Sequence, residues 1–249
     1  MQVNNLNNSL FQTLEKNKKA AENAIERIAS GKNKQLDDVA LALIANSLGS
    51  EISGLTQGLE NANSATSLLQ IADGVLSGLS QGADDLNVLA IKANNPALNS
   101  SQQKIIQQEA DAIGSALQNS IDNASFNGQP IFGRSFDFNL GNSTVSTSLP
   151  SINISDFDLN SQEGIEDFVK VVQESQSEVG STINELTSSS KSITAQVQAL
   201  SASKSQISDT DIAKEVSTLT QSELLINAAS ITLSHQNNIN AQRVSSLLA

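Results

Sequence analysis

The chain of 249 residues contains no cysteine, which excludes disulfide bonds, thiolate metal ligands and thiol catalysis. Histidine occurs once, at His235, whereas an HExxH zinc-protease motif needs two histidines. The SGK segment at 30–32 lacks the spacing and the following Ser or Thr of a phosphate-binding loop. The pairs Asp37-Asp38 and Asp84-Asp85 fit turns or helix caps better than a metal site. We therefore expect no enzymatic activity, no bound metal and no cofactor.

Large aromatic side chains and proline are also scarce. The chain has no Trp, no Tyr and seven Phe, and 38% of its residues are hydrophobic. A compact globule normally uses more aromatic anchors, whereas a thin helical bundle can fill its seam with Leu, Ile, Val and Ala. The only prolines are Pro96, Pro130 and Pro150, which leaves long stretches at both ends free to form helices.

Basic residues are outnumbered by acidic ones, 14 to 26, and the formal net charge is −12. This balance argues against binding to nucleic acid or to an anionic membrane surface. No apolar run approaches the roughly 20 residues that a membrane-spanning helix needs. The first residues also lack the basic and apolar regions of a cleavable signal peptide, so export would need a route that reads no such signal.

Apolar residues recur at helical spacing over most of the chain and predict helices at 4–31, 40–94, 102–125 and from about 161. Gly31 is a plausible end for the first helix. A coiled-coil seam with alternating steps of four and three is expected in the second helix at Leu48, Ile52, Leu55, Leu59, Ala62, Thr66 and Leu69. It continues through Ala72, Leu76, Leu79, Ala83, Leu86 and Ala90.

The third and fourth helices carry their own apolar faces. We expect one broad face of the third helix to hold Ile105, Ile106, Glu109, Ala112, Ile113, Ala116, Leu117 and Ile121. A second seam is expected at Val179, Ile183, Leu186, Ser190, Ile193, Val197 and Leu200, with weaker packing at Ser190. Several glycines within the second helix indicate close helix packing or tolerance of bending, among them Gly54, Gly58, Gly74, Gly78 and Gly82.

Residues 126–157 differ in composition and hold five of the seven Phe. Two alternating runs on either side of Gly141-Asn142 predict a β-hairpin. A break at 207–211 offers a helix N-cap at Ser208 or Asp209, before a last helix at about 211–247. The expected fold is therefore mainly α, a long antiparallel helical hairpin or coiled-coil bundle with a small β-hairpin segment at about 126–157.

Long motifs at both ends of the chain resemble the bacterial flagellins. The first part carries AIERIASGK at 24–32, DDVALALIAN at 37–46, EISGLTQGLENANSATSLLQIADGVL at 51–76 and SFNGQPIF at 125–132. The last part carries QISDTDIAKEVSTLTQSELL at 206–225 and ends in RVSSLLA. The resemblance covers roughly 1–132 and 165–249, and only about thirty residues separate the FNGQPIF motif from the returning helix. It implies a short flagellin without the bulky middle domains of many family members.

The resemblance implies a two-part organisation and a structural function. Residues 1–35 and 207–249 would form an inner terminal coiled coil, and 36–206 an outer helical domain that includes the β-hairpin. The chain would be a secreted subunit of the bacterial flagellar filament, exported by the flagellar type III apparatus for swimming motility. Its partners would be further copies of itself, a flagellin secretion chaperone, and the hook-associated and cap proteins.

Polymerisation and chaperone binding would use apolar residues near the two ends: Leu6, Leu10, Leu14, Ile25, Ile28, Leu224, Leu225, Leu233, Val244, Leu247 and Leu248. The resemblance also implies an altered hot spot for the host Toll-like receptor that detects flagellin. Asp85 stands at the hot-spot Arg position, Leu89 at the Leu and Glu109 at the Glu. An acidic residue at the position of the central Arg removes the hydrogen-bond donors of that Arg and repels an acidic partner. We therefore expect weak or absent receptor recognition.

Three alternatives to a filament subunit remain open from the sequence. A secreted flagellin-like effector that acts on host cells could share the short length. The hook–filament junction protein shares the terminal helices, although the run at 51–76 fits a flagellin better. A helical signalling hairpin would share the heptads but should lack the Phe-rich segment.

Overall fold

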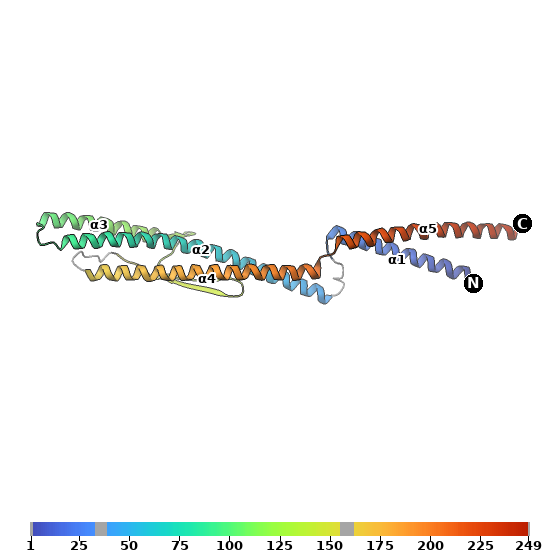
Figure 1. Ribbon diagram of the computed structural model, residues 1–249, viewed down its shortest axis with the longest axis horizontal. Helices are drawn as coiled ribbons and strands as arrows, with labels where there is room; N and C mark the ends of the chain where they lie inside the picture. Colours follow the sequence, from blue (N-terminus) through green and yellow to red (C-terminus); the bar gives the residue numbers. More distant parts are fainter. Residues whose placement is uncertain (1, 33–38, 155–161, 249) are drawn as a thin grey trace. The chain divides into compact units, whose positions relative to one another are not determined.

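The computed structural model of the chain describes residues 2–32, 39–154 and 162–248, and their side chains at 8–32, 40–154, 164–242, 245 and 246. Five helices and four short strands are present in these ranges (Figure 1). They are α1 (Gln2–Ser30), α2 (Val39–Ala93), α3 (Ser100–Asn123), β1 (Ser125–Phe126), β2 (Gln129–Pro130), β3 (Arg134–Asn139), β4 (Thr144–Leu149), α4 (Gln162–Ser208) and α5 (Ile212–Leu248). The predicted mainly α fold with a small β-hairpin is confirmed.

The chain forms two compact units. Unit 1 comprises Met1–Ser50 and Ala199–Ala249, and unit 2 comprises Glu51–Gln198. The helices α2 and α4 each contribute residues to both units. No helix in the described ranges is both long enough and apolar enough to cross a lipid bilayer.

Unit 2 is built on the apolar seam of α2. The buried residues of this seam include Leu55, Ala62, Leu69, Ala72, Leu76, Leu79, Ala83, Leu86 and Ala90. They follow the predicted alternation of four and three, which keeps one face of a long helix toward its neighbours. On α4 the predicted seam is likewise buried at Val179, Leu186 and Ile193. The half-buried Ser190 lines a polar groove of about 400 Å³ with Thr66 and Thr187, so the seam is less tightly filled there.

The inner face of α3 differs from the expected one. Ile105 is 62% exposed, and Ala112 and Ala116 are exposed as well. Ile121 is buried and Ile106, Ile113 and Leu117 are partly buried, as predicted. Ala110, which the prediction left out, is buried as well. The expected face was too broad because apolar residues lie on more than one side of α3, and periodicity alone does not show which side meets α2.

The β3–β4 hairpin is antiparallel and turns at Gly141, as the alternating pattern predicted. One face of the hairpin carries the buried Val145, Thr147 and Leu149, and the other carries hydroxyl and amide side chains. Hydrogen bonds fasten the hairpin to both long helices. The Asn61 amide of α2 donates to the Asn139 carbonyl over 2.8 Å, and Asn142 donates to the Gln196 side chain of α4 over 3.3 Å.

Two of the five glycines singled out on α2 lie where a side chain would be crowded. A β-carbon at Gly58 would overlap the carbonyl oxygen of Leu140, and one at Gly82 would lie 2.6 Å from the Leu117 side chain. Close approach of the hairpin backbone to α2 therefore requires glycine at Gly58. At Gly82 an added methyl group would displace the end of the flexible Leu117 side chain, which costs less. At Gly54, Gly74 and Gly78 a β-carbon would meet nothing within 4 Å.

Unit 1 is centred on the packing of α1 against α5. The end of α1 lies beside the start of α5, since Arg27 pairs with Glu215 over 3.1 Å, so the two helices run antiparallel (Figure 1). Gly31 ends α1 in the left-handed conformation, with φ of +67°, and its N–H donates to the Arg27 carbonyl. The predicted stop at Gly31 is thus confirmed.

The joint between α4 and α5 is held by a short backbone bridge and by carboxylates. Lys32 and Asp209 form an isolated antiparallel bridge, and the Thr210 N–H donates to the Gly31 carbonyl over 3.1 Å. The N-cap of α5 is Asp211, whose carboxylate accepts from the N–H groups of Ala213 and Lys214. The expected cap at Ser208 or Asp209 is therefore wrong, because α4 extends to Ser208 and the break is only three residues long.

Asp209 has a different role from capping α5. Hydrogen bonds from the hydroxyls of Ser205 and Ser208, with Lys32 and Lys204 nearby, hold the pKa of Asp209 below its ordinary value of 3.8. A carboxyl whose pKa is lowered by folding stabilises the folded joint above its unfolded pKa. That contribution is lost as the pH falls through the folded pKa.

The close contact at Gly58 gives a test of the packing in unit 2. We expect Gly58→Ala to lower the free energy of unfolding by roughly 1–3 kcal/mol, because the added methyl group forces the hairpin off α2. The matched control is Gly74→Ala on the same helix, where the methyl meets open space. It should raise stability by up to about 1 kcal/mol through helix propensity. Urea unfolding followed by circular dichroism at 222 nm measures the free energy of unfolding of both variants. Equal changes in the two variants would contradict a close packing contact at Gly58.

The Asp209 contacts predict an acid-sensitive joint. Amide hydrogen exchange in peptides covering 199–215 should be faster near pH 3 than near pH 6, after correction for intrinsic rates, because protonation weakens the contacts of the carboxylate. Asp209→Asn should exchange faster at pH 6 and show a smaller change with pH. Glu223→Gln, at an exposed position of α5, is the control and should behave as the unmodified chain. An Asp209→Asn variant with the unmodified pH dependence would refute this role.

Candidate functional site

The seam between α1 and α5 mixes leucine and isoleucine with alanine and with polar residues. Buried and half-buried positions recur at steps of four and three on each helix, as in a coiled coil. On α1 they include Leu10, Leu14, Asn17, Ala21, Ala24 and Ile28. On α5 they include Glu215, Leu219, Ser222, Ile226, Ala229, Leu233, Gln236 and Asn240. Among the described residues, the buried Asn17 Nδ2 and Gln236 Oε1 atoms have no hydrogen-bond partner, which lowers the stability of this seam.

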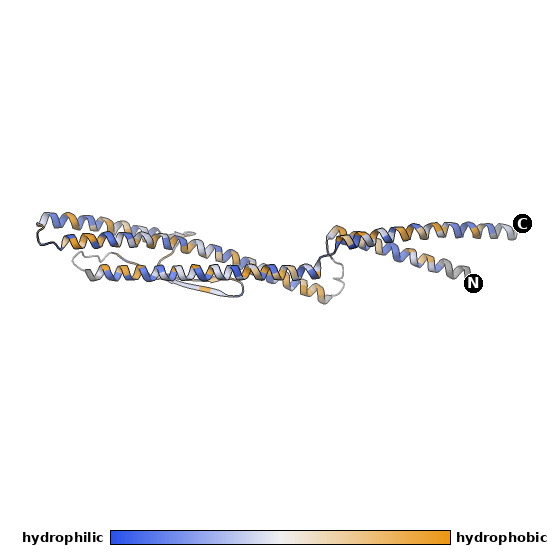
Figure 2. Ribbon diagram, in the orientation of Figure 1, coloured by the Kyte–Doolittle hydropathy of each residue, from blue (hydrophilic) through white to orange (hydrophobic). Residues whose placement is uncertain are grey.

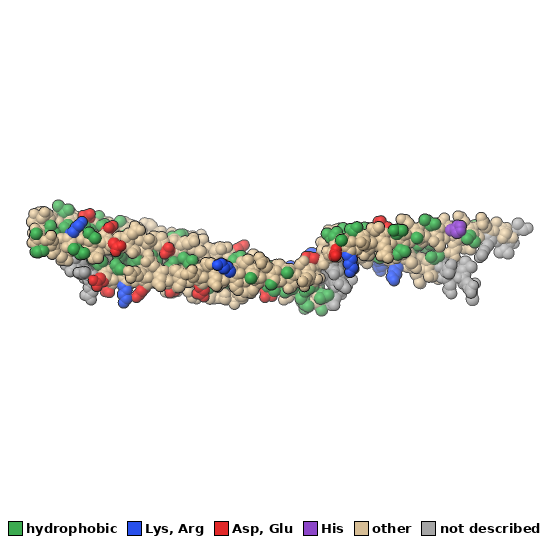
Figure 3. All heavy atoms as spheres, in the orientation of Figure 1, with side chains coloured by type: hydrophobic (Ala, Val, Ile, Leu, Met, Phe, Trp, Pro, Cys, Tyr) green, Lys and Arg blue, Asp and Glu red, His purple; other side chains and the backbone are tan. Residues whose placement is uncertain are grey.

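Large apolar side chains lie on the outside of the same two helices. On α5 the exposed fraction is 66% for Leu224 and 71% for Ile231. The full set on the described parts of α1 and α5 is Phe11, Ile25, Ile212, Val216, Leu224, Leu225, Ile231 and Ile239. Figure 3 shows hydrophobic side chains gathered along the visible surface of α5, and Figure 2 shows apolar residues recurring along its whole length. Exposed apolar surface of this extent marks a protein interaction site.

The structure divides the predicted polymerisation residues into two groups. Leu10, Leu14, Ile28 and Leu233 lie in or beside the seam between α1 and α5. Three others are exposed and free to contact another protein: Ile25, Leu224 and Leu225. The side chains of Leu6, Val244, Leu247 and Leu248 lie outside the described residues.

Sequence reasoning missed five exposed apolar residues of this surface. Phe11, Ile212, Val216, Ile231 and Ile239 lie at positions that a simple two-helix coiled coil would make polar. The signal was present in the sequence, since apolar residues occur around the whole circumference of α5 and not along one stripe.

The Arg27–Glu215 ion pair sets the register of α1 against α5. The Glu215 side chain is 8% exposed and the Arg27 side chain 31%, so the pair is partly shielded from water. Thr210 also donates a hydrogen bond to Glu215 over 3.3 Å. A charged hydrogen bond of this kind fixes geometry more than it adds stability, because both groups lose hydration.

The residues of the implied receptor hot spot differ in accessibility. Asp85 and Glu109 are exposed. Leu89 is only 5% exposed and belongs to the core cluster with Leu86, Ala110 and Ile165. The leucine is therefore not available on the surface of unit 2.

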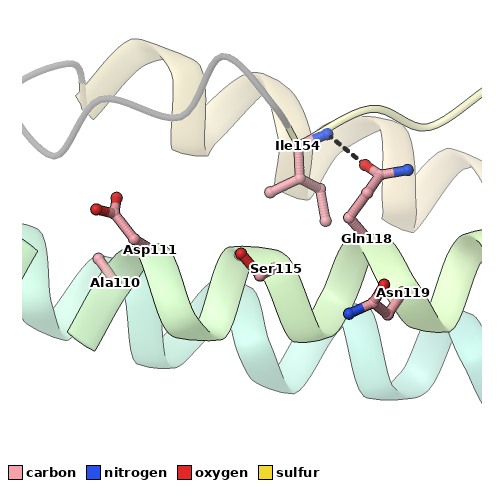
Figure 4. A pocket seen from close by; sticks show the side chains of 7 residues that line it. Ala110, Asp111, Ser115, Gln118, Asn119 and Ile154 are labelled. Carbon is pink, nitrogen blue, oxygen red and sulfur yellow. Dashed lines mark hydrogen bonds between the residues drawn. The ribbon is translucent and has the colours of Figure 1, made fainter. Parts of the chain in front are cut away.

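Several grooves of the described surface contain carboxylates. One is lined by Asp209, Asp211 and Glu215 together with Arg27 and Lys214. A groove of about 430 Å³ on α3 is bounded by Ala110, Asp111, Ser115 and Asn119 (Figure 4). Within it the Gln118 side chain accepts a hydrogen bond from the N–H of Ile154 over 3.1 Å. Asp111 is the one carboxylate among the described residues of its lining.

No cluster of three or more potential metal ligands is found among the described residues. His235 is exposed on α5. The features that distinguish this molecule are therefore the apolar outer faces of α1 and α5.

Comparison with known proteins assigns the family. The family model of the bacterial flagellin N-terminal helical region matches residues 2–137, and that of the bacterial flagellin C-terminal helical region matches 162–248. The chain is 35% identical over 233 residues to "Secreted flagellin C" of Campylobacter jejuni serotype O:6, and the match covers 92% of each protein. It is 27% identical over 248 residues to a flagellin of Halalkalibacterium halodurans, with 90% of each chain covered.

Both helical regions thus match in the expected order, and the relatives of similar length align over nearly all of the chain. The exposed apolar faces of the terminal helices have the character of a self-assembling subunit. The chain belongs to the bacterial flagellin family, the secreted structural proteins that polymerise into the flagellar filament.

Proposed function

We propose that this chain polymerises through unit 1, with α1 and α5 of neighbouring copies burying one another's outer apolar faces. The observation that carries the proposal is that large apolar residues, among them Leu224 and Ile231, stay exposed on α1 and α5 outside the seam that already joins the two helices. Burying one exposed Leu or Ile contributes roughly 1.5–3 kcal/mol. Eight such residues per copy therefore supply a large driving force for assembly.

This mode of assembly gives the two parts of the chain different places in the filament. Residues 1–35 and 207–249 would form the inner coiled coil of the tube, and 36–206 would form the outer domain. Unit 2 supports this division because its α2 seam is buried within the chain itself and needs no further copy to cover it. Unit 1 has no comparable core of its own.

The same outer face of α5 is a candidate for binding other proteins before and during assembly. A secretion chaperone that covers Leu224, Leu225 and Ile231 would prevent premature association of copies in the cell. Hook-associated and cap proteins would contact the terminal helices at the two ends of the polymer. Each of these partners would bind an apolar helical face, which is a common mode of helix recognition.

A second candidate function is that of a soluble secreted flagellin. The supporting observation is that two relatives of matching length, 35% and 34% identical, are named "Secreted flagellin C". Immunogold labelling of filaments, compared with the amount of protein in the culture supernatant, separates the two functions. Label along the filament supports the subunit, and label confined to the soluble fraction supports the second candidate. No observation favours the hook–filament junction protein.

We also propose that this chain is recognised weakly by the host Toll-like receptor for flagellin. The exposed Asp85 places a negative charge where recognition would use a cation. The burial of Leu89 in the core of unit 2 removes the apolar contact beside it.

The outer face of α5 can be tested by substitution. Leu224→Gln combined with Ile231→Gln should raise the critical concentration for polymerisation by on the order of tenfold or more, because two large apolar contacts between copies are lost. The circular dichroism of the isolated chain should be unchanged, since both residues are exposed. Leu224→Met with Ile231→Leu is the matched control and should polymerise normally. Unchanged sedimentation of polymer in the Gln variant would reject assembly through this face.

The receptor proposal predicts low potency in a cell reporter assay. Asp85→Arg should raise activation only partly, because it restores the charge but leaves Leu89 buried. Asp73→Arg, at another exposed acidic position of α2, serves as the control for a general effect of positive charge. Full potency of the unmodified chain would contradict the proposal.

A further inference from the structure

The turn between β1 and β2 contains the one Asn-Gly pair of the chain, Asn127-Gly128. Phe126 pairs with Gln129, so only these two residues connect the strands. Asn127 has φ of +51° and Gly128 has φ of +75°, and two positive values identify a type I′ turn. In the part of the chain that the structure describes, Asn127 is the one residue other than glycine with a positive φ.

An asparagine followed by glycine readily loses its side-chain amide. The backbone nitrogen of the glycine attacks the side-chain carbonyl carbon (Cγ) of the asparagine and forms a C–N bond. The C–NH2 bond breaks, and ammonia leaves with the proton of the attacking amide. Water then opens the five-membered imide to aspartate or to isoaspartate, in which the main chain runs through the β-carbon. Glycine favours the attack because it has no side chain to shield its nitrogen.

The type I′ geometry keeps the reacting atoms apart. Closure of the ring requires the Gly128 nitrogen and the Asn127 β-carbon to lie on the same side of the Cα–C bond of Asn127. In a type I′ turn the first central residue has φ of about +60° and ψ of about +30°. At that ψ the Gly128 nitrogen lies nearly opposite the β-carbon across this bond, so it does not reach Cγ. The turn must therefore open before the folded chain can react.

We infer that Asn127 is a site of spontaneous deamidation, reactive in the unfolded chain and protected once the β1–β2 turn forms. Asn127 is exposed, so its protection comes from the backbone conformation and not from burial. Two hydrogen bonds beside the turn hold it closed. The N–H of Ile131 donates to the Ala124 carbonyl over 3.1 Å, and Arg134 donates to the Gln129 side chain over 2.9 Å. The inference does not depend on polymerisation through unit 1.

The isoaspartate product would prevent the same turn from forming again. It lengthens the main chain within a two-residue connection, where the loop length fixes the register of the strands. The residues that follow are buried, with Ile131 0% exposed and Phe132 9% exposed. A chain that stays unfolded for long before its secretion would thus acquire a change that impairs the packing of unit 2. The aspartate product keeps the chain length, and aspartate also tolerates the left-handed conformation.

The experiment compares the folded full-length chain with the same chain kept unfolded in guanidinium chloride, both at pH 8 and 37 °C. Tandem mass spectrometry of tryptic peptides measures deamidation of Asn127 over time. The reaction should be on the order of tenfold or more faster in the unfolded chain, because it needs no opening of the turn. Asn142 is the internal control, since it is exposed in the β3–β4 turn and is followed by serine. It should react slowly in both samples.

The effect on packing is measured on chains that already carry isoaspartate at position 127, separated by chromatography after ageing. Returned to buffer, they should unfold at a lower urea concentration than the unmodified chain. The matched control is the variant Asn127→Asp, which has the aspartate product but the normal chain length. It should unfold close to the urea midpoint of the unmodified chain.

Three outcomes would overturn the inference. Equal rates at Asn127 in the folded and unfolded samples would mean that the turn gives no protection. An unreactive Asn127 in the unfolded chain, over a time in which the synthetic peptide SFNGQPIF deamidates, would mean that no such site exists. An isoaspartate chain with the urea midpoint of the unmodified chain would refute the effect on unit 2.

Discussion

Large apolar side chains fill only part of the seam between α1 and α5. Ala21, Ala24 and Ala229 bury little apolar area, and Asn17 and Gln236 each bring a buried atom without a hydrogen-bond partner. Because the free energy of unfolding is a small difference between large terms, alanines and unpaired polar atoms at these positions reduce what the seam contributes to the stability of unit 1. The larger residues outside the seam become stabilising only when another helix covers them, so the surface of unit 1 depends on association.

Unit 2 uses small residues for a different purpose. At Gly58 and Gly82 the missing side chain lets the hairpin and α3 approach α2 closely. The leucines of α2 then fill the space between these elements and are almost completely buried. A small residue that lets two elements come close allows the neighbouring leucines to make more contacts. A small residue at a position where a leucine would fit leaves fewer contacts between the helices. The two units thus differ in where their large side chains lie, which is mostly inside the α2 seam in unit 2 and in large part outside the α1–α5 seam in unit 1.

Periodicity predicted most of the fold and only part of the site. Three features were predicted correctly: the α2 seam, the end of α1 at Gly31 and the hairpin at Gly141. In each case the local sequence pattern is compatible with a single structure. The sequence patterns of α3 and α5 are compatible with more than one arrangement, because both helices carry apolar residues on more than one side. A sequence shows which residues share a face of a helix, but not whether that face meets the same chain or another one. For this reason Ile231 and Phe11 were missed, although their exposure is the most informative property of unit 1.

The formal charge of the chain also differs between the two units. Unit 1 contains nine acidic and nine basic residues, and unit 2 carries the whole net charge of −12. Apolar attraction between helices acts at short range, and a net charge on the same helices would oppose it over a longer distance. The exposed apolar residues of α1 and α5 thus lie in the part of the chain where repulsion between like charges is weakest.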